Sequence, residues 1–136
     1  MTTKSSGFSL IELLVVVAIL GILASVGMKS YSGYVSSTKR KSAENVLQQI
    51  SLGQTEFYSS NGSYYSATGS NCAPSTSTSD LIETNLLGGA DAISTDLSYE
   101  MCIYGHSSNY MVKAKANTGT CEITMTANGT FTRTNC

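Results

Sequence analysis

The sequence predicts an α+β protein, in which a long N-terminal helix (about residues 8–58) is followed by a small antiparallel sheet. Three observations predict this class: a nearly uncharged apolar run, a helical repeat of apolar residues after it, and alternation of apolar and polar residues in the last forty positions. The chain has 136 residues. This length gives room for one domain with a single modest core.

The apolar run is the first element. It has no charged residue over positions 13–28, and it reaches back to Phe8 with only Ser9 and Glu12 as polar interruptions. A helix needs about 20 predominantly apolar residues to cross a bilayer. A core helix is the alternative, but so small a domain cannot bury a helix that is apolar on all sides. We therefore predict that residues 8–28 form a membrane segment.

The second element is an amphipathic continuation of this helix over residues 29–58. Its apolar residues recur at helical spacing and would cover one face of a sheet: Ala43, Val46, Leu47, Ile50 and Phe57. Residues 59–136 are then expected to form a globular head. Its first part, residues 59–97, is rich in Ser, Thr, Asn and Gly and is predicted to be a loop, including the Ser75–Ser79 run.

The sheet is expected over residues 98–136, with three or four antiparallel strands. Apolar side chains alternate with polar ones in three stretches: Tyr99, Met101 and Ile103; Tyr110, Val112, Ala114 and Ala116; and Cys121, Ile123, Met125 and Ala127. The third stretch ends at Asn128-Gly129, a strong signal for a hairpin turn.

The four cysteines all lie in the second half of the chain. An even number of cysteines in a small domain behind a membrane segment indicates two disulfides and an oxidising compartment. Zinc is the alternative, but the gaps of 29, 18 and 14 intervening residues fit no common zinc module. We expect no metal and no cofactor.

A two-residue hairpin loop at Asn128-Gly129 would predict the pairing. Facing residues would then sum to 257, so Ile123 faces Thr134 and Cys121 faces Cys136 at a distance suited to a disulfide. By elimination Cys72 pairs with Cys102. The same register would place Arg133 diagonal to Glu122. Three connectivities are possible for four cysteines, and this one is favoured.

The N-terminus carries the most specific motif. A polar leader of seven residues ends at Gly7 and is followed by Phe8-Ser9-Leu10-Ile11-Glu12-Leu13. A secretory signal has its cleavage site after the apolar core, not before it. A carboxylate this deep in an apolar run costs roughly 2.5 kcal/mol or more. The stretch from Gly7 to Ala24 strongly resembles the prepilin signal of type IV pilins and type II secretion pseudopilins.

The resemblance implies several site residues. A membrane peptidase would cleave after Gly7 and then N-methylate the new terminal residue, Phe8. In a filament, Glu12 would pair with the terminal amine of a neighbouring subunit. Small residues that recur every third position would let helices approach closely: Ala18, Gly21, Ala24 and Gly27. Pilins of this kind commonly have a proline where this chain has Lys29, so a proline kink is not expected.

The resemblance extends through the end of the predicted helix. Pilins and pseudopilins often have a recurrent pattern there, present here as Gln54, Tyr58, Asn61-Gly62 and Tyr64. It also implies the localisation, which is the inner membrane with a periplasmic head, followed by an extracellular pilus. Lys4 alone precedes the apolar run, while Lys29 and residues 39–41 follow it, which by the positive-inside rule favours the opposite orientation. The cysteines and the leader motif outweigh that count.

The composition gives little support to an enzyme. The chain has one His and 12% charged residues, and His106 is expected to be a solvated residue in a turn. The resemblance implies a structural subunit of a type IV pilus for adhesion, twitching motility or DNA uptake. Its expected partners are further copies or other pilins, the prepilin peptidase and the assembly machinery.

Two other functions stay open at this point. The first is a type II secretion pseudopilin, although the chain has no acidic calcium loop near its C-terminus. The second is a minor pilin that acts as a DNA-uptake receptor. The region after Tyr58 has six acidic and three basic residues, and DNA binding requires clustered positive charge.

Overall fold

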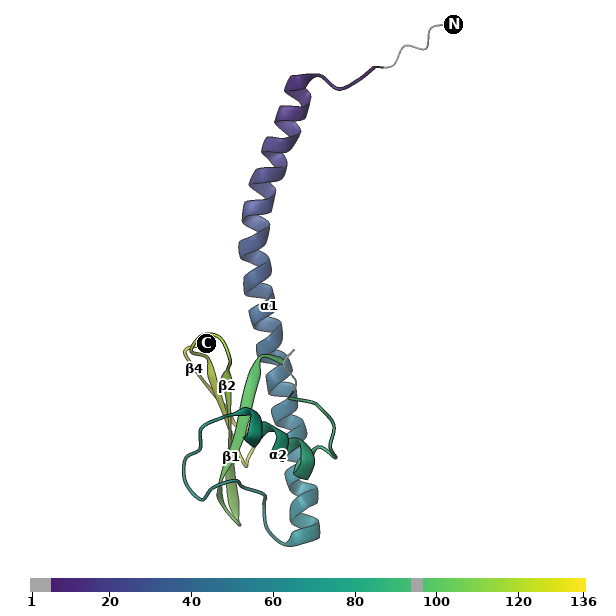
Figure 1. Cartoon of the computed structure of the whole chain (residues 1–136). Coiled ribbons are helices and arrows are strands. Elements are labelled where there is room, and N and C mark those ends of the chain that lie inside the picture. Colours follow the sequence, from purple (N-terminus) through teal and green to yellow (C-terminus); the bar gives the residue numbers. More distant parts are fainter. Residues whose placement is uncertain (1–5, 94–96) are drawn as a thin grey trace, which may run out of the picture. The chain divides into compact units, whose positions relative to one another are not determined.

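The computed structural model describes residues 6–93 and 97–136 (Figure 1). Two compact units divide the chain, one up to Thr38 and one over residues 39–136, and each is described by itself. Lys4 of the predicted leader lies outside the described residues.

Helix α1 spans Leu10–Asn61, which confirms the long N-terminal helix with its ends two or three residues later than predicted. In the first unit, every residue from Ser6 to Tyr34 is exposed. The helix is continuous through Lys29. No described residue of this unit supplies a surface that could cover the apolar side chains.

The second unit contains helix α2 (Thr76–Leu86) and a four-stranded antiparallel sheet. The strands are β1 (Tyr99–His106), β2 (Asn109–Ala116), β3 (Glu122–Thr126) and β4 (Phe131–Thr134), and they pair in the order in which they follow one another. The structure therefore confirms the predicted α+β class, and the three alternating stretches form β1, β2 and β3.

One core holds this unit together. The face of α1 that carries Ala43, Leu47 and Ile50 is fully buried, as its helical spacing predicts. These residues pack with the inward side chains of the sheet and with α2: Met101, Ile103, Val112, Ala114, Ile123, Met125 and Ile82 are at most 1% exposed. Phe57 is only partly buried at the edge of this core.

Helix α2 corrects the prediction that residues 59–97 form a loop. Ser75 caps the helix, because its hydroxyl accepts a bond from the Thr78 amide while the Thr78 hydroxyl accepts one from the Ser75 amide. Ile82 and Leu86 then lie one turn apart and are buried in the core. Tertiary burial of these two side chains outweighs the weak helix propensity of the surrounding Ser and Thr residues.

Gly53 allows α1 and α2 to approach closely. A Cβ atom at this position would lie 2.5 Å from the Leu86 carbonyl oxygen, and a backbone atom cannot move aside as a side chain can. We predict that Gly53→Ala lowers the free energy of unfolding by about 1–3 kcal/mol. The matched control is Gly33→Ala, at an exposed helical position with nothing nearby, which should stabilise by up to about 1 kcal/mol. Thermal unfolding of the full chain in micelles measures both, and equal effects would contradict the prediction.

The hairpin of β3 and β4 corrects the predicted register. Met125 pairs with Phe131 and Ile123 pairs with Arg133, so facing residues are shifted by one from the predicted alignment. The loop holds three residues instead of two, since the Thr126 amide donates to the Thr130 carbonyl. Of the loop residues, only Gly129 has a positive φ, of 83°. A two-residue type I′ turn needs a positive φ at both central positions.

The shift reverses the two faces of β4, because successive side chains point to opposite sides of a strand. Phe131 now packs against the core. Arg133 forms a salt bridge with Glu44 of α1 and is not the predicted partner of Glu122. Its pKa is raised by the hydrogen bond to this carboxylate.

The disulfides join the same cysteines that the sequence analysis pairs, Cys121 with Cys136 and Cys72 with Cys102. The first bond forms although the predicted register is wrong. Asn135 has a φ of 56°, a left-handed conformation that bends the chain after β4. This bend accommodates the extra residue, and the Cα atoms of Cys121 and Cys136 are 4.5 Å apart.

Glu83 is a buried carboxylate in α2, 8% exposed. Its Oε1 accepts a hydrogen bond from the Ile93 amide at 3.1 Å. Burial raises the pKa of this carboxyl above its usual value of 4.5, and the neighbouring charges of Asp91 and Asp80 add to the effect. The folded state therefore binds the proton of Glu83 more tightly than the unfolded chain does. The free energy of unfolding then falls as the pH rises from 4.5 through the raised pKa of the folded state.

We predict that Glu83→Gln removes this pH dependence, because the amide oxygen still accepts the Ile93 bond but carries no charge. The variant should be at least as stable as the wild type at pH 7 and should lose the stability that the wild type gains as the pH falls from 7 towards the usual carboxyl pKa of 4.5. Midpoints of thermal unfolding across this range provide the measurement. Glu56→Gln, at an exposed position of α1, is the control and should keep the wild-type profile.

Candidate functional site

The N-terminal segment is the candidate site, and it begins with an open stretch before the helix. Gly7 and Phe8 are not helical, and Phe8 is 86% exposed. A Cβ atom at Gly7 would meet nothing within 4 Å. Packing within the described chain therefore does not require glycine at position 7. If glycine is required there, the reason must be binding by another protein, such as a processing enzyme.

Ser9 and Glu12 form a capping box at the start of α1. The Ser9 amide donates to Oε2 of Glu12 at 2.9 Å, and the Glu12 amide donates to the Ser9 hydroxyl at 3.3 Å. This reciprocal pair satisfies two backbone amides that the first helical turn leaves without partners. Glu12 thus has a local role that the sequence analysis missed, although the Ser-x-x-Glu spacing is its usual sequence signature.

The capping box uses only one of the two carboxylate oxygens of Glu12. Only Oε2 accepts a bond from the described residues, and the side chain lies on an exposed turn. A carboxylate near a helix N-terminus also interacts favourably with the helix dipole. Oε1 can therefore accept a bond from a cationic group of another molecule without breaking the cap.

The small residues Ala18, Gly21, Ala24 and Gly27 all lie on the helical part of the first unit and are exposed. They follow an i±3 row, one of the ridges through which helices pack. Neither Gly21 nor Gly27 has another atom within 4 Å of a would-be Cβ. Packing inside the chain gives no reason for glycine at either position.

The same unit exposes a long apolar surface. One helix is long and apolar enough to cross a membrane by length and composition, with a mean hydropathy of 2.7 over its 18-residue window. Its side chains include Leu10, Ile11, Ile22 and Leu23, each 63–85% exposed. Soluble monomers rarely expose apolar patches of more than a few hundred Å². An exposed apolar surface of this extent is typical of a site that contacts a membrane or another protein.

Gln54 is a second residue whose role the sequence did not reveal. Its side chain is fully buried, and its amide bonds both main-chain groups of one residue. Nε2 donates to the Tyr65 carbonyl at 2.7 Å, and Oε1 accepts from the Tyr65 amide at 2.8 Å. This pair of bonds fixes the chain to α1 soon after the helix ends. The i+4 spacing from Ile50 could have placed Gln54 on the buried face.

Possible metal ligands are dispersed in the described part of the chain. Within residues 6–93 and 97–136, no group of three or more His, Cys, Asp or Glu side chains could hold a metal ion. His106 is exposed at the end of β1, next to the turn that was predicted to hold it.

Comparison with known proteins identifies the class of the N-terminal segment. Residues 2–28 match the family model described as the prokaryotic N-terminal methylation motif. The motif covers the open stretch at Gly7, the capping box and the whole small-residue row. No solved structure gives a significant match.

The first half of the chain is similar to curated fimbrial proteins and pilins. The chain is 39% identical over 56 residues to the fimbrial protein EcpC of Eikenella corrodens, which is 41% of this chain and 37% of that protein. It is 36% identical over 64 residues to the type IV major pilin protein PilE1 of Neisseria gonorrhoeae, covering 47% and 39%. It is 34% identical over 61 residues to the type IV major pilin protein PilA of Myxococcus xanthus, covering 45% and 28%.

These findings confirm the recognition made from the sequence, and the chain is related to type IV pilins. The match spans less than two fifths of the length of these relatives.

Proposed function

We propose that the chain is a structural subunit of a type IV pilus. The observation that carries this proposal is the exposed apolar first part of α1, which lies within the methylation motif, in one chain with a disulfide-bonded head. Such a chain can lie in a membrane as a precursor and then bury the same helix among other copies in a filament. The relatives are pilins, and the inferred role is structural rather than enzymatic.

Processing would occur in the open stretch before α1. The prepilin peptidase would cut between Gly7 and Phe8 and methylate the Phe8 amine. Removal of residues 1–7 leaves Ser9, and with it the helix cap, on the mature chain. Residues 8–28 would then form the membrane or filament-core segment, with residues 29–58 and the head 59–136 outside it.

Assembly would use Glu12 and the small-residue row. The free Oε1 of Glu12 would pair with the Phe8 amine of a neighbouring subunit, which offsets two charges in an apolar environment. The row of Ala18, Gly21, Ala24 and Gly27 would allow close helix contacts. Partners would be further copies or other pilins together with the assembly machinery.

The localisation follows from the same features. The membrane helix would hold the precursor in the inner membrane, and disulfides form in the periplasm rather than in a reducing cytosol. The assembled pilus is extracellular and would serve adhesion, motility or DNA uptake. The closed C-terminal loop at Cys121 and Cys136 favours a pilin over a pseudopilin.

A DNA-receptor role has less support. Two of the three cations at positions 39–41 bond within the head, since Lys39 donates to the Ser98 hydroxyl and Arg40 to the Cys136 carbonyl. The remaining cation, Lys41, is exposed.

The intact mass of protein sheared from cells tests the proposal. We expect a chain that starts at methylated Phe8 and carries two disulfides. High abundance in filaments would indicate a major pilin, and trace amounts a minor one. A filament protein that starts at Met1 or Thr2 would contradict the processing step, and absence of the chain from sheared filaments would contradict the function.

A further inference from the structure

A cavity at the end of the β1–β2 hairpin lies outside the assembly segment. Its volume is about 270 Å³, slightly below the roughly 300–1,000 Å³ of sites for drug-sized ligands. It has room for one small ring compound. The residues that matter for its chemistry come from three segments: Ser70 and Asn71; Tyr104 and His106; Asn109 and Tyr110.

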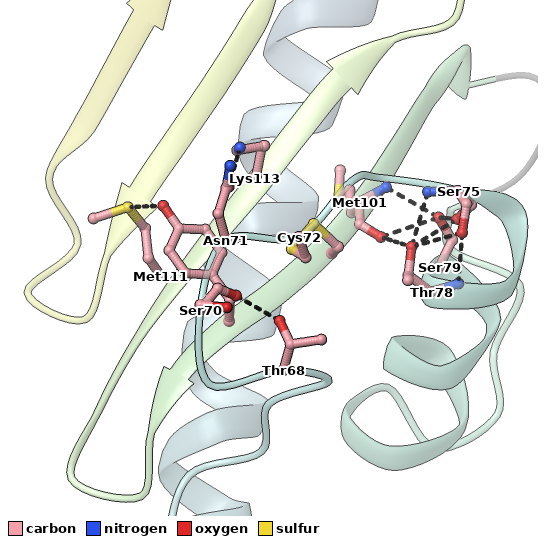
Figure 2. The surroundings of a disulfide bond; sticks show 12 residues. Thr68, Ser70, Asn71, Cys72, Ser75, Thr78, Ser79, Met101, Met111 and Lys113 are labelled. Atoms are coloured by element: carbon pink, nitrogen blue, oxygen red, sulfur yellow. Dashed lines mark hydrogen bonds between the residues drawn. A yellow bond between two sulfur atoms is a disulfide. The ribbon is translucent and has the colours of Figure 1, made fainter.

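The wall formed by residues 69–71 is held firmly against β1. The Ala67 amide donates to the Ile103 carbonyl at 2.9 Å, and the Gly105 amide donates to the Thr68 carbonyl at 3.0 Å. The disulfide between Cys72 and Cys102 fixes the other end of this segment (Figure 2). The cavity is therefore preformed, which reduces the entropy lost when a ligand binds.

Gly105 shapes the floor of the cavity. Its φ is 140°, and a Cβ atom there would lie 2.6 Å from the Asn109 carbonyl oxygen and 2.9 Å from the Tyr110 Cα. Only glycine allows the two strands to come this close at the end of the hairpin.

The aromatic wall is Tyr104, which is held in place by its neighbours. Its hydroxyl donates to the Met111 sulfur at 2.8 Å, and Lys113 Nζ lies 5.6 Å from the ring centre. Tyr104 is half-buried. A ring fixed in this way offers a flat apolar surface at little cost in side-chain entropy.

Two amides line the cavity with their acceptor atoms already occupied. The Asn109 Oδ1 accepts a bond from the Tyr110 amide at 3.0 Å. The Asn71 Oδ1 accepts one from Lys113 Nζ (Figure 2). Each side chain therefore keeps its NH₂ group, with two donors, for another molecule. Ser70 and His106 have exposed side chains without a partner among the described residues.

We infer that this cavity binds one neutral sugar unit. No Asp, Glu, Lys or Arg lines it, which disfavours a charged ligand. A fitting ligand presents an apolar face to a lining that is mostly apolar, and hydroxyls to the NH₂ groups of the exposed Asn71 and Asn109 side chains. A pyranose ring satisfies both requirements, because its C–H face packs on the tyrosine ring and its hydroxyls accept from the amides.

The test uses the full chain in phosphocholine micelles, because this detergent contains no sugar. The probes are the methyl glycosides of glucose, galactose and N-acetylglucosamine, followed by saturation-transfer NMR. We expect transfer to the ring protons of at least one glycoside, and shifts of the side-chain NH₂ signals of Asn71 and Asn109. The absence of transfer to all three glycosides would overturn the proposal.

Two variants remove a donor while keeping the structural acceptor. Asn109→Asp still accepts from Tyr110, and Asn71→Asp still accepts from Lys113, but neither has an NH₂ group. Each should weaken binding about three- to tenfold, while Tyr104→Phe, which keeps the ring, should retain it. Asn128→Asp, at an exposed turn elsewhere, is the matched control. Binding that persists in both donor variants, or that falls equally in the control, would overturn the assignment.

This inference is independent of filament assembly. The unassembled chain carries the whole cavity, so failure of sugar binding says nothing about the pilus, and failure of assembly says nothing about the cavity.

Discussion

Glu12→Gln should leave the start of α1 intact but reduce the yield of filaments at least tenfold. Glutamine can replace glutamate in a capping box, so its amide oxygen still accepts from the Ser9 amide. What the variant loses is the negative charge that would pair with the Phe8 amine of a neighbour. A charge-assisted bond contributes about 1.5–3 kcal/mol, and 1.4 kcal/mol already corresponds to a factor of ten in an equilibrium constant.

Ser9→Ala is the matched control for this prediction. It removes the hydroxyl that accepts from the Glu12 amide but keeps the carboxylate, and the lost cap costs about 1 kcal/mol. Its filament yield should stay close to that of the wild type. Yield is measured by shearing cells and quantifying the chain against the amount in the membrane. If Ser9→Ala loses filaments as severely as Glu12→Gln, then capping and not charge is the function of this glutamate.

Much of the fold follows from local patterns in the sequence. The 3.6-residue repeat of α1 and the two-residue alternation of β1 to β3 are visible without any knowledge of the partners they pack against. The N-terminal motif is equally local, because the leader, the glutamate and the apolar run are adjacent. Sequence reasoning succeeds where a single element carries its own signal.

The features that it missed depend on contacts between distant segments. Helix α2 contains two Ser and three Thr residues, which are weak helix formers, and the buried side chains of Ile82 and Leu86 stabilise it together with the Ser75 cap. The hairpin register depends on competition between a two-residue and a three-residue loop. The longer loop buries Phe131 and brings Arg133 to Glu44, and neither contact can be read from residues 121–136 alone.

The functional residues also differ in whether a local sequence pattern or a distant contact explains them. Phe8 and Glu12 stand out in the sequence because the motif contains them. Gln54 belongs to a recurrent pattern, but the sequence does not show its role, because a polar residue on a buried helix face is explained only by the chain segment that it bonds. That segment, at Tyr65, lies eleven positions away, beyond the reach of a helical repeat.

Gln54→Leu should therefore be among the most destabilising single changes in the head. Leucine has a similar size and keeps the site apolar, but it leaves the Tyr65 amide and carbonyl without partners. Each buried unpaired group costs about 1–3 kcal/mol, so we expect a loss of roughly 2–4 kcal/mol in the free energy of unfolding. For a unit of this size that corresponds to a midpoint about 10 °C lower or more.

The matched control is Gln49→Leu, the same substitution at an exposed position of the same helix. It should change the free energy of unfolding by no more than about 0.5 kcal/mol. Hydrogen exchange of the Tyr65 amide adds a local readout. This amide should exchange slowly in the wild type and rapidly in Gln54→Leu, while the Val112 amide at the centre of the sheet stays protected under native conditions. A Gln54→Leu variant as stable as Gln49→Leu would show that Tyr65 finds other partners, and that the paired amide bonds do not anchor the chain to α1.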